Sequence, residues 1–252
     1  VAQGIQVTLV DAGHILGSSI VRMRLTAPGA GRDTVIVFSG DLGRPGTPIL
    51  RDPTIVSEAD IVLCESTYGG REHEAAEQAV DTLAEVVNET ARKNGVLLIP
   101  AFAIGRTQEI VWELGRLVEA GRIPKLPLYL DSPMAKAASD IYRAHPEAYD
   151  EETAKLLREH HAPLDYPAQH VVQNVQESEK IARAHPPYVI VASNGMLTGG
   201  RSVGHAERIL DDPRATVLFV GYQGEGTLGG HLMRGAERAR INGRDMPIRA
   251  TI

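Results

Sequence analysis

Short apolar runs alternate with longer amphipathic stretches through the middle of the chain, between about residues 61 and 221. The runs are rich in β-branched residues, as expected of strands buried on both faces of a parallel sheet. In the stretches between them, apolar residues recur every three or four positions, which predicts helices that cover this sheet. The five predicted strands are residues 61–64, 96–99, 128–130, 188–192 and 216–220.

The two ends of the chain have a different pattern. Residues 21–25 alternate apolar and basic side chains, which is typical of a strand with one solvated face, and residues 240–252 suggest two short strands around Asn242-Gly243. Antiparallel pieces on both sides of an α/β unit predict one module inserted into another. Two helix starts are also predicted, with Ser132 capping a helix that begins at Pro133 and acidic residues 150–152 in the first turn of another.

Composition narrows the protein class. Of the 252 residues, 43% are hydrophobic, yet no apolar run approaches the roughly 20 residues that a membrane helix needs. We therefore expect that this is not a membrane protein. The formal charge of -6 means that any nucleic-acid site must be local, because bulk charge does not favour a polyanion. A single cysteine, Cys64, excludes an intrachain disulfide framework and a cysteine-rich zinc module. The expected compartment is the cytoplasm.

All five predicted strands end in small or polar residues. Ligands bind at the carboxyl edge of an open parallel sheet, so these loops predict a shared crevice. Residues 198–201, Thr-Gly-Gly-Arg, are the best anion candidate, because backbone amides at a helix start and a guanidinium together suit a phosphate. The alternative is that the glycines and Ser132-Pro133 only form tight turns.

The N-terminal region contains a different candidate. His14 and Asp41 both follow predicted strands, and an imidazole and a carboxylate are donors that zinc accepts. Two ligands are too few for a catalytic zinc site. Considered alone, His14 is better explained as a hydrogen-bonded loop histidine than as a ligand, and Asp41 as a turn former beside glycine.

Seven blocks, taken in order, resemble the β-CASP nucleases, the nucleic-acid-cleaving branch of the metallo-β-lactamase fold. The resemblance spans nearly the whole chain, and seven ordered blocks are far more specific than any single motif. The blocks are DAGHILGSS at 11–19, FSGDLGR at 38–44, ESTYGGREH at 65–73, PAFAIGRTQE at 100–109, YLDSPMA at 129–135, ASNGMLTGGR at 192–201 and GYQGEGTLG at 221–229.

The resemblance implies a fold and a reaction. The expected fold is α/β, with a β-CASP domain (a parallel sheet flanked by helices) at 61–222, inserted in an incomplete metallo-β-lactamase αββα domain made of 1–60 and 223–252. The implied reaction is hydrolysis of RNA phosphodiester bonds with two Zn²⁺ in the complete protein, on RNA that is single-stranded. A homodimer is a further option.

The resemblance also assigns roles to residues. His14 corresponds to a metal ligand and Asp41 to the carboxylate that bridges two zinc ions. Glu65 corresponds to the first acidic motif of the β-CASP domain and is expected to orient a ligating histidine, the alternative being a carboxylate at a helix start. Together His14, Asp41 and Glu65 are the catalytic candidates. The substrate-binding candidates are Ser132, Thr198, Gly199, Gly200, Arg201, Gly226 and Thr227.

The chain departs from the family pattern because several of the family's metal-ligand motifs are not in its sequence. The main ligand cluster, His-x-His-x-Asp-His, and two later histidine motifs are expected outside the 252 residues, so this chain alone is expected to be inactive. One alternative is a non-catalytic β-CASP protein that binds RNA or a protein partner. Another is a plain nucleotide-binding α/β domain, which the absence of G-x-G-x-x-G after the first strand and of a Walker lysine disfavours.

Overall fold

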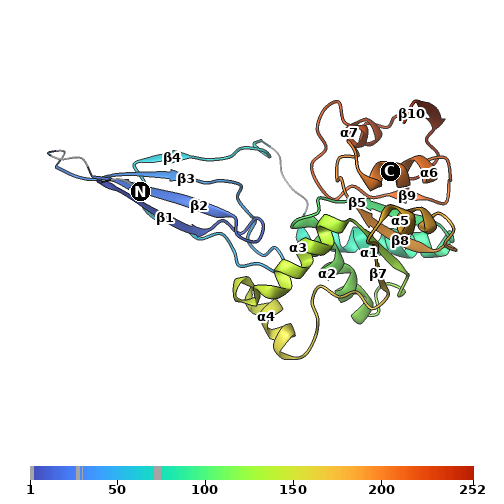
Figure 1. Cartoon of the computed structure of the whole chain (residues 1–252), viewed down its shortest axis with the longest axis horizontal. Coiled ribbons are helices and arrows are strands. Elements are labelled where there is room, and N and C mark those ends of the chain that lie inside the picture. Colours follow the sequence, from blue (N-terminus) through green and yellow to red (C-terminus); the bar gives the residue numbers. More distant parts are fainter. Residues whose placement is uncertain (1–2, 27–28, 30, 71–74) are drawn as a thin grey trace. The chain divides into compact units, whose positions relative to one another are not determined.

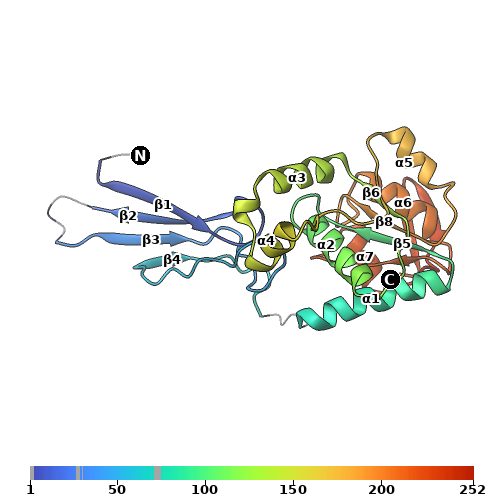
Figure 2. The ribbon, with the colours of Figure 1, turned by 90° about the horizontal axis from the view of Figure 1, so that it is seen from below.

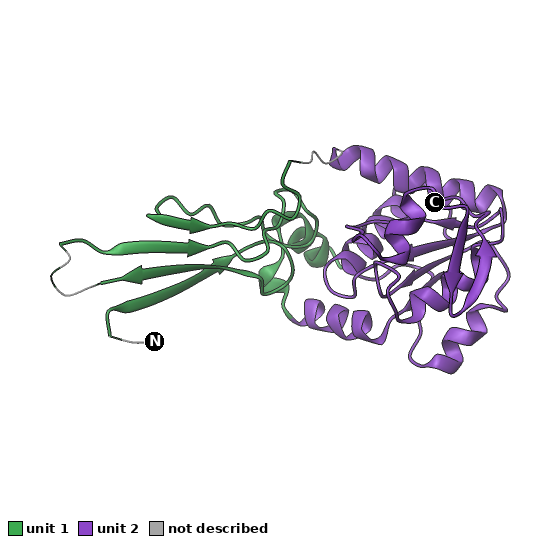
Figure 3. Cartoon of the chain, turned by 90° about the horizontal axis from the view of Figure 1, so that it is seen from above, with its two compact units in different colours: residues 1–73, 145–161 green, residues 74–144, 162–252 purple. Residues whose placement is uncertain are grey.

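The computed structural model describes residues 3–26, 29, 31–70 and 75–252, which form two compact units (Figure 3). Unit 1 comprises residues 1–73 and 145–161, and unit 2 comprises residues 74–144 and 162–252. The end of the 65–73 block, including His73, lies outside the described residues. No helix in the described part of the chain is long and apolar enough to cross a membrane.

Unit 1 is built on a four-stranded sheet in the order β1-β2-β3-β4 (Figure 1). The strands β1 (Ile5–Asp11), β2 (Ser19–Leu25) and β3 (Thr34–Phe38) pair antiparallel, and β4 (Ile61–Leu63) pairs with β3 in parallel. Strands β1, β3 and β4 therefore run in the same direction. Their carboxyl ends lie along the same edge of the sheet.

The prediction for residues 61–64 is wrong in one respect. The segment is a strand, but it extends the unit 1 sheet instead of the five-stranded sheet. Its side chains are also exposed, at 49% for Ile61, 62% for Val62 and 50% for Leu63. An apolar run predicts a strand without specifying its partner, and only three residues pair here.

The second piece of unit 1 returns from later in the chain. It carries the short 3-10 helix η1 (Pro146–Ala148) and α4 (Glu151–Arg158). The predicted helix start is confirmed, with Glu151 and Glu152 in the first turn, while Asp150 caps α4 by accepting a hydrogen bond from the backbone N–H of Thr153 at 2.6 Å. The segment pairs with residues 49–51: the N–H of Asp150 donates to the carbonyl of Ile49 at 2.9 Å, and Leu50 and Tyr149 form a β-bridge.

Unit 2 contains a parallel five-stranded sheet in the order β7-β6-β8-β5-β9. Three strands confirm the prediction: β5 (Val96–Pro100), β6 (Leu128–Asp131) and β8 (Tyr188–Ala192). The predicted strand at 216–220 is present but shorter, because β9 covers only Thr216–Val217. The fifth, β7 (Gln169–Val171), was not predicted, because a three-residue edge strand with two polar residues has no apolar signature.

Helices cover both faces of this sheet, as the amphipathic stretches predicted (Figures 1 and 2). Leu97, Leu128 and Val189 pack on one side, and Leu98 and Ile190 on the other. The first side is covered by α1 (Ala76–Arg92), α2 (Arg106–Glu119) and α3 (Pro133–Ala144). The second is covered by α5 (Val175–Ile181), α6 (Arg201–Ile209), α7 (Leu228–Met233) and β10 (Arg238–Ile241), which pairs with β11 (Arg244–Pro247).

Local signals for turns and caps are also confirmed. The Ser132 hydroxyl accepts a hydrogen bond from the N–H of Ala135 at 3.1 Å, and α3 begins at Pro133. Asn242 and Gly243 have φ of 48° and 82° between β10 and β11, as a two-residue hairpin turn requires. This hairpin packs within unit 2, so the compact units divide the chain differently from the predicted boundaries at 60 and 222. The assignment of domains 1–60, 61–222 and 223–252 stays a prediction.

Candidate active site

Three catalytic candidates gather at one edge of the unit 1 sheet. His14, Asp41 and Glu65 follow β1, β3 and β4, whose carboxyl ends share that edge. The loops that carry the first two contact each other through backbone, since the N–H of Gly43 donates to the carbonyl of Ala12 at 2.8 Å. A Cβ at Gly43 would lie 1.7 Å from the carbonyl oxygen of Gly13, so only glycine permits this approach. We call His14, Asp41 and Glu65 the edge cluster.

Glu65 fixes the turn that carries Asp41. One carboxylate oxygen of Glu65 accepts a hydrogen bond from the N–H of Leu42 at 3.2 Å, and the other accepts one from the N–H of Thr67 at 3.1 Å. Hydrogen bonds from the Thr67 side chain and backbone and from Leu42 outweigh burial and hold the pKa of Glu65 below its usual value, and the charge of His14 lowers it further. Glu65 is thus an ionised clamp between two loops. It is not at a helix start, because α1 begins only at Ala76.

The edge cluster supplies donors of the right type for zinc, but too few. His14 and Asp41 are exposed and offer an imidazole and a carboxylate. Within the described ranges, no group of three or more His, Cys, Asp or Glu residues could hold a metal ion, and a two-ion centre needs more ligands than two. The residues described here therefore do not form a complete metal centre by themselves.

The substrate-binding candidates lie together in unit 2. They follow the carboxyl ends of β6, β8 and β9, which are neighbours of one another or of β5 in the sheet. We call residues 193–201 the β8 loop and residues 221–229 the β9 loop. The N–H of Gly229 donates to the carbonyl of Met196 at 3.1 Å, and the Gln223 amide donates to the carbonyl of Gly195 at 3.0 Å. The two loops are therefore fixed to each other.

The substrate-binding candidates differ in how exposed they are and in whether their hydroxyl groups are already hydrogen-bonded. Thr198 and Gly200 are exposed, and Gly200 caps α6 at a φ of 76° that favours glycine. The Ser132 hydroxyl is buried, where it caps α3 and accepts a hydrogen bond from the Ser193 hydroxyl at 3.0 Å. The Thr227 hydroxyl caps α7 through the N–H of Gly230 at 3.0 Å. Gly199 is half-buried, and Gly226 is exposed at a φ of 78°.

Arg201 belongs to a buried network that the sequence analysis missed. Its guanidinium donates to the carboxylate of Asp131, which is fully buried and also accepts from the hydroxyl of Ser178 at 2.5 Å and bonds Nε2 of His205 at 2.6 Å. Burial raises the pKa of Asp131, but hydrogen bonds from His205, Ser178 and Arg201 outweigh it and hold the pKa below its usual value. We call Asp131, Ser178, Arg201 and His205 the Asp131 network.

A signal for this network was present in the sequence. Arg201 and His205 are four residues apart on one helix, so they share a face, and Asp131 is a charged residue at the end of a buried strand. A buried aspartate is rarely left without a cationic partner. The structure thus groups the candidates within each unit. The crevice predicted from five loops of a single sheet is corrected in one respect, because the loop after residues 61–63 follows a strand of the unit 1 sheet.

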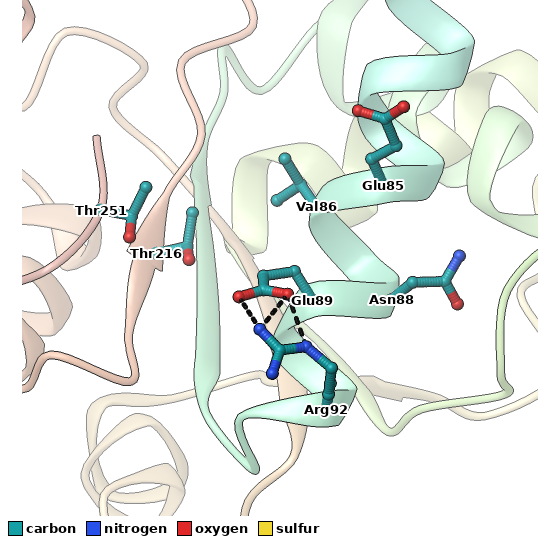
Figure 4. A pocket seen from close by; sticks show the side chains of 7 residues that line it. All are labelled: Glu85, Val86, Asn88, Glu89, Arg92, Thr216 and Thr251. Atoms are coloured by element: carbon teal, nitrogen blue, oxygen red, sulfur yellow. Dashed lines mark hydrogen bonds and ion pairs between the residues drawn. The ribbon is translucent and has the colours of Figure 1, made fainter.

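A separate pocket of about 550 Å³ lies between α1 and the edge strand β9 (Figure 4). In it, Arg92 forms an ion pair with Glu89 at 2.6 Å. The pocket includes Thr216, the first residue of β9, so it opens toward the amino end of that strand and is distinct from the β9 loop. It is lined by Glu85, Val86, Asn88, Glu89, Arg92, Thr216 and Thr251.

Comparison with known proteins places these features in a family context. Residues 107–232 match the Beta-Casp domain family. The chain is 37% identical to ribonuclease TTHA0252 of Thermus thermophilus over 242 residues, covering 96% of this chain and 54% of that protein. It is 36% identical to transcription termination factor FttA of Thermococcus kodakarensis over 250 residues, covering 97% of this chain and 38% of that protein. The chain thus spans about half or less of the length of these relatives.

Proposed function

The chain belongs to the β-CASP family of the metallo-β-lactamase fold, and from this premise we propose that the protein hydrolyses phosphodiester bonds in RNA. The observation that carries the proposal is the edge cluster: an imidazole and two carboxylates from three separate loops converge at one sheet edge. The similarity to a protein named as a ribonuclease supports RNA as the substrate. The FttA relative is named as a transcription termination factor, which is compatible with action on a transcript.

We assign different roles to the three residues of the edge cluster. His14 and Asp41 are exposed, so their side chains are available to a metal ion or to substrate. Glu65 has both carboxylate oxygens engaged by backbone N–H groups, so its role is to hold the Asp41 turn in place. A carboxylate held in this way does not need to reorganise during a reaction.

Two Zn²⁺ in the complete protein are part of the proposal, with His14 and Asp41 among their ligands. Zinc supplies a Lewis acid and a source of hydroxide at neutral pH. Further ligands would have to come from outside the described residues, which do not complete such a centre.

The RNA strand is proposed to pass over the β8 and β9 loops. The residues that line or support this path are Ser132, Thr198, Gly199, Gly200, Arg201, Gly226 and Thr227. Thr198 and Gly200 are exposed residues of this path, and backbone amides there would suit phosphate oxygens. Single-stranded RNA is part of the proposal, because a narrow path would exclude a duplex. Action in the cytoplasm and assembly as a homodimer remain parts of the proposal that an assay in solution can address.

The test uses the full-length protein and a 5′-labelled single-stranded RNA. Asp41→Ala and His14→Ala are expected to lower kcat by about 10³-fold, equivalent to several kcal/mol of transition-state stabilisation. Glu58→Gln is the matched control, because Glu58 is an exposed carboxylate of unit 1 whose contact is a 3.6 Å ion pair with Arg22. Zinc content, measured by mass spectrometry, should fall in the two alanine variants and not in the control.

The outcomes separate the hypotheses. RNA cleavage that survives Asp41→Ala would contradict the assignment of the edge cluster. Tight RNA binding by a full-length protein that neither cleaves RNA nor retains zinc would favour a non-catalytic β-CASP protein. Nucleotide binding that RNA does not compete with would favour the plain nucleotide-binding domain.

A further inference from the structure

The Asp131 network is a buried group of charged and polar residues to which the proposed RNA hydrolysis assigns no catalytic role. We infer that Asp131 is a positioning residue, which holds the β8 loop in the form that binds RNA, and that Arg201 acts through Asp131 and not as a phosphate ligand. The inference rests on the proposed function for its substrate. Its structural part can be tested without RNA.

Two adjacent residues at the end of β6 hold both ends of the β8 loop. At the start of the loop, the Ser193 hydroxyl donates to Ser132 at 3.0 Å. At its end, Arg201 donates to Asp131. The loop is thereby attached at two points to the neighbouring strand of the sheet, because β6 and β8 pair directly. A change at Asp131 therefore acts on the far end of the loop.

The same end of the loop is also tied back to its beginning. The N–H of Ser202 donates to the carbonyl of Ser193 at 3.0 Å, and the Ser202 hydroxyl donates to the carbonyl of Asn194 at 2.8 Å. A displacement of Arg201 would pull on Ser202, its neighbour in the chain, and so on these bonds. The exposed residues Thr198 and Gly200 lie between the two attachment points.

The charge of Arg201 is used inside the protein. Its side chain is only 19% exposed and that of Asp131 is fully buried, so the ion pair is largely removed from water. The same guanidinium nitrogen also lies 3.4 Å from the carbonyl oxygen of Val172. A cation neutralised by a buried carboxylate contributes little electrostatic attraction for an RNA phosphate at the protein surface. Among the described residues, loss of the Arg201 guanidinium would leave Asp131 with His205 and Ser178 as its side-chain partners.

The experiment compares Asp131→Asn with wild type in the full-length protein. Asparagine keeps the shape and removes the charge, so the network loses the anion that organises it. Hydrogen exchange of the amides of residues 194–200 should become at least tenfold faster. The KM for a single-stranded RNA should rise about tenfold while kcat and zinc content stay within twofold, since the edge cluster is unchanged. Asp140→Asn, an exposed aspartate on α3 in ion pairs with Lys136 and Arg143, is the control and should change neither.

Arg201→Gln distinguishes positioning from direct phosphate contact. If Arg201 acts through Asp131, Arg201→Gln and the double variant with Asp131→Asn should raise KM no further than Asp131→Asn alone, because neighbours in one network are not additive. The slope of log Kd for RNA against log salt concentration should also stay unchanged. A direct phosphate contact would lower the magnitude of that slope by about 1 and make the two substitutions additive, which would overturn the inference.

Two further results keep the test decisive. If Asp131→Asn does not fold, Ser178→Ala replaces it, because this change removes one hydrogen bond to Asp131 and leaves the charges in place. It should speed exchange in the β8 loop by a smaller factor, about three to fivefold. Unchanged exchange in a folded variant would overturn the inference. Wild-type protein that fails to bind RNA would remove the proposed function, while the exchange data would still decide whether Asp131 holds the loop.

Discussion

Units 1 and 2 hold their candidate loops by different physical means. In unit 2, the β8 loop is anchored by the Asp131 network at the end of a sheet that has helices on both faces. In unit 1, the loops of the edge cluster rest on close backbone contact at Gly43 and on the half-buried clamp of Glu65. The buried core beneath them, among the described residues, is Ala12, Ile20, Val35 and Val37.

The difference indicates which substitutions each unit tolerates. Loops held by a buried network depend on charge and on the packing of the sheet beneath. Loops held by backbone approach depend on the absence of a side chain at one position. Comparable losses of RNA binding or cleavage should therefore arise from different kinds of substitution in the two units.

The largest effect on stability is expected from Leu98→Ala in β5. Leu98 is fully buried, so its truncation should lower the free energy of unfolding by about 2–5 kcal/mol. Leu9→Ala in β1 is the matched control, since Leu9 is 63% exposed and should change stability by less than about 0.5 kcal/mol. Urea unfolding measures both, and equal losses would contradict the contrast in burial between these strands.

A large effect on activity is expected from Gly43→Ala in the full-length protein. The new Cβ would collide with the backbone of Gly13, which forces the His14 and Asp41 loops apart. A displacement of about 1 Å lowers kcat/KM by about 100-fold. RNA cleavage is the measurement, with circular dichroism to verify folding. Activity close to that of wild type would mean that the two loops need not touch.

Acid should weaken the protein through the two carboxylates whose pKa is lowered. Asp131 and Glu65 have folded-state pKa values below their usual ones, so each contributes stability above about pH 4, and the contribution is lost as the pH falls through the folded-state value. Urea midpoints between pH 7 and pH 3 should fall for wild type. The midpoint of Asp131→Asn should fall less steeply with pH than that of wild type. The profile of Glu65→Gln should differ less from wild type, because solvent screens Glu65 more than the buried Asp131. Identical profiles for Asp131→Asn and wild type would contradict this account.

The smallest effect is expected from Gly115→Ala in α2. A Cβ at Gly115 would meet nothing within 4 Å, and glycine inside a helix costs about 0.5–1 kcal/mol relative to alanine. The substitution should therefore raise the unfolding free energy by about that amount without changing RNA cleavage. A loss of stability would show that α2 is packed more closely than its contacts indicate.

Much of unit 2 could be predicted from the sequence, because most of its strands are apolar runs and its main helices have a periodic apolar face. The cap at Ser132 and the Asn242-Gly243 turn were equally readable, since each depends on neighbouring residues alone. The partner of strand 61–63 and the short strand β7 were not, because pairing is decided by distant residues. Resemblance to a family, more than spacing, indicated the edge cluster.

The Asp131 network shows where such reasoning stops. The sequence identified Arg201 as a phosphate candidate from its place beside two glycines. Its carboxylate partner lies seventy residues earlier in the chain and was considered only as part of a strand end. A charge can be identified from sequence, but the ion that neutralises it depends on the tertiary fold.

The pairing of residues 49–51 with residues 148–150 has a consequence for synthesis on the ribosome. The earlier partner leaves the exit tunnel roughly a hundred residues before the later one, which at 5–20 residues per second is a delay of about 5–20 seconds. During that interval the nascent chain carries the buried side chain of Ile49 without its final neighbours, while β5, α2 and β6 are still emerging. Unit 1 can therefore close only after residues 74–144 of unit 2, somewhat less than half of that unit, have been translated. Until then its unpaired apolar residues are accessible to chaperones.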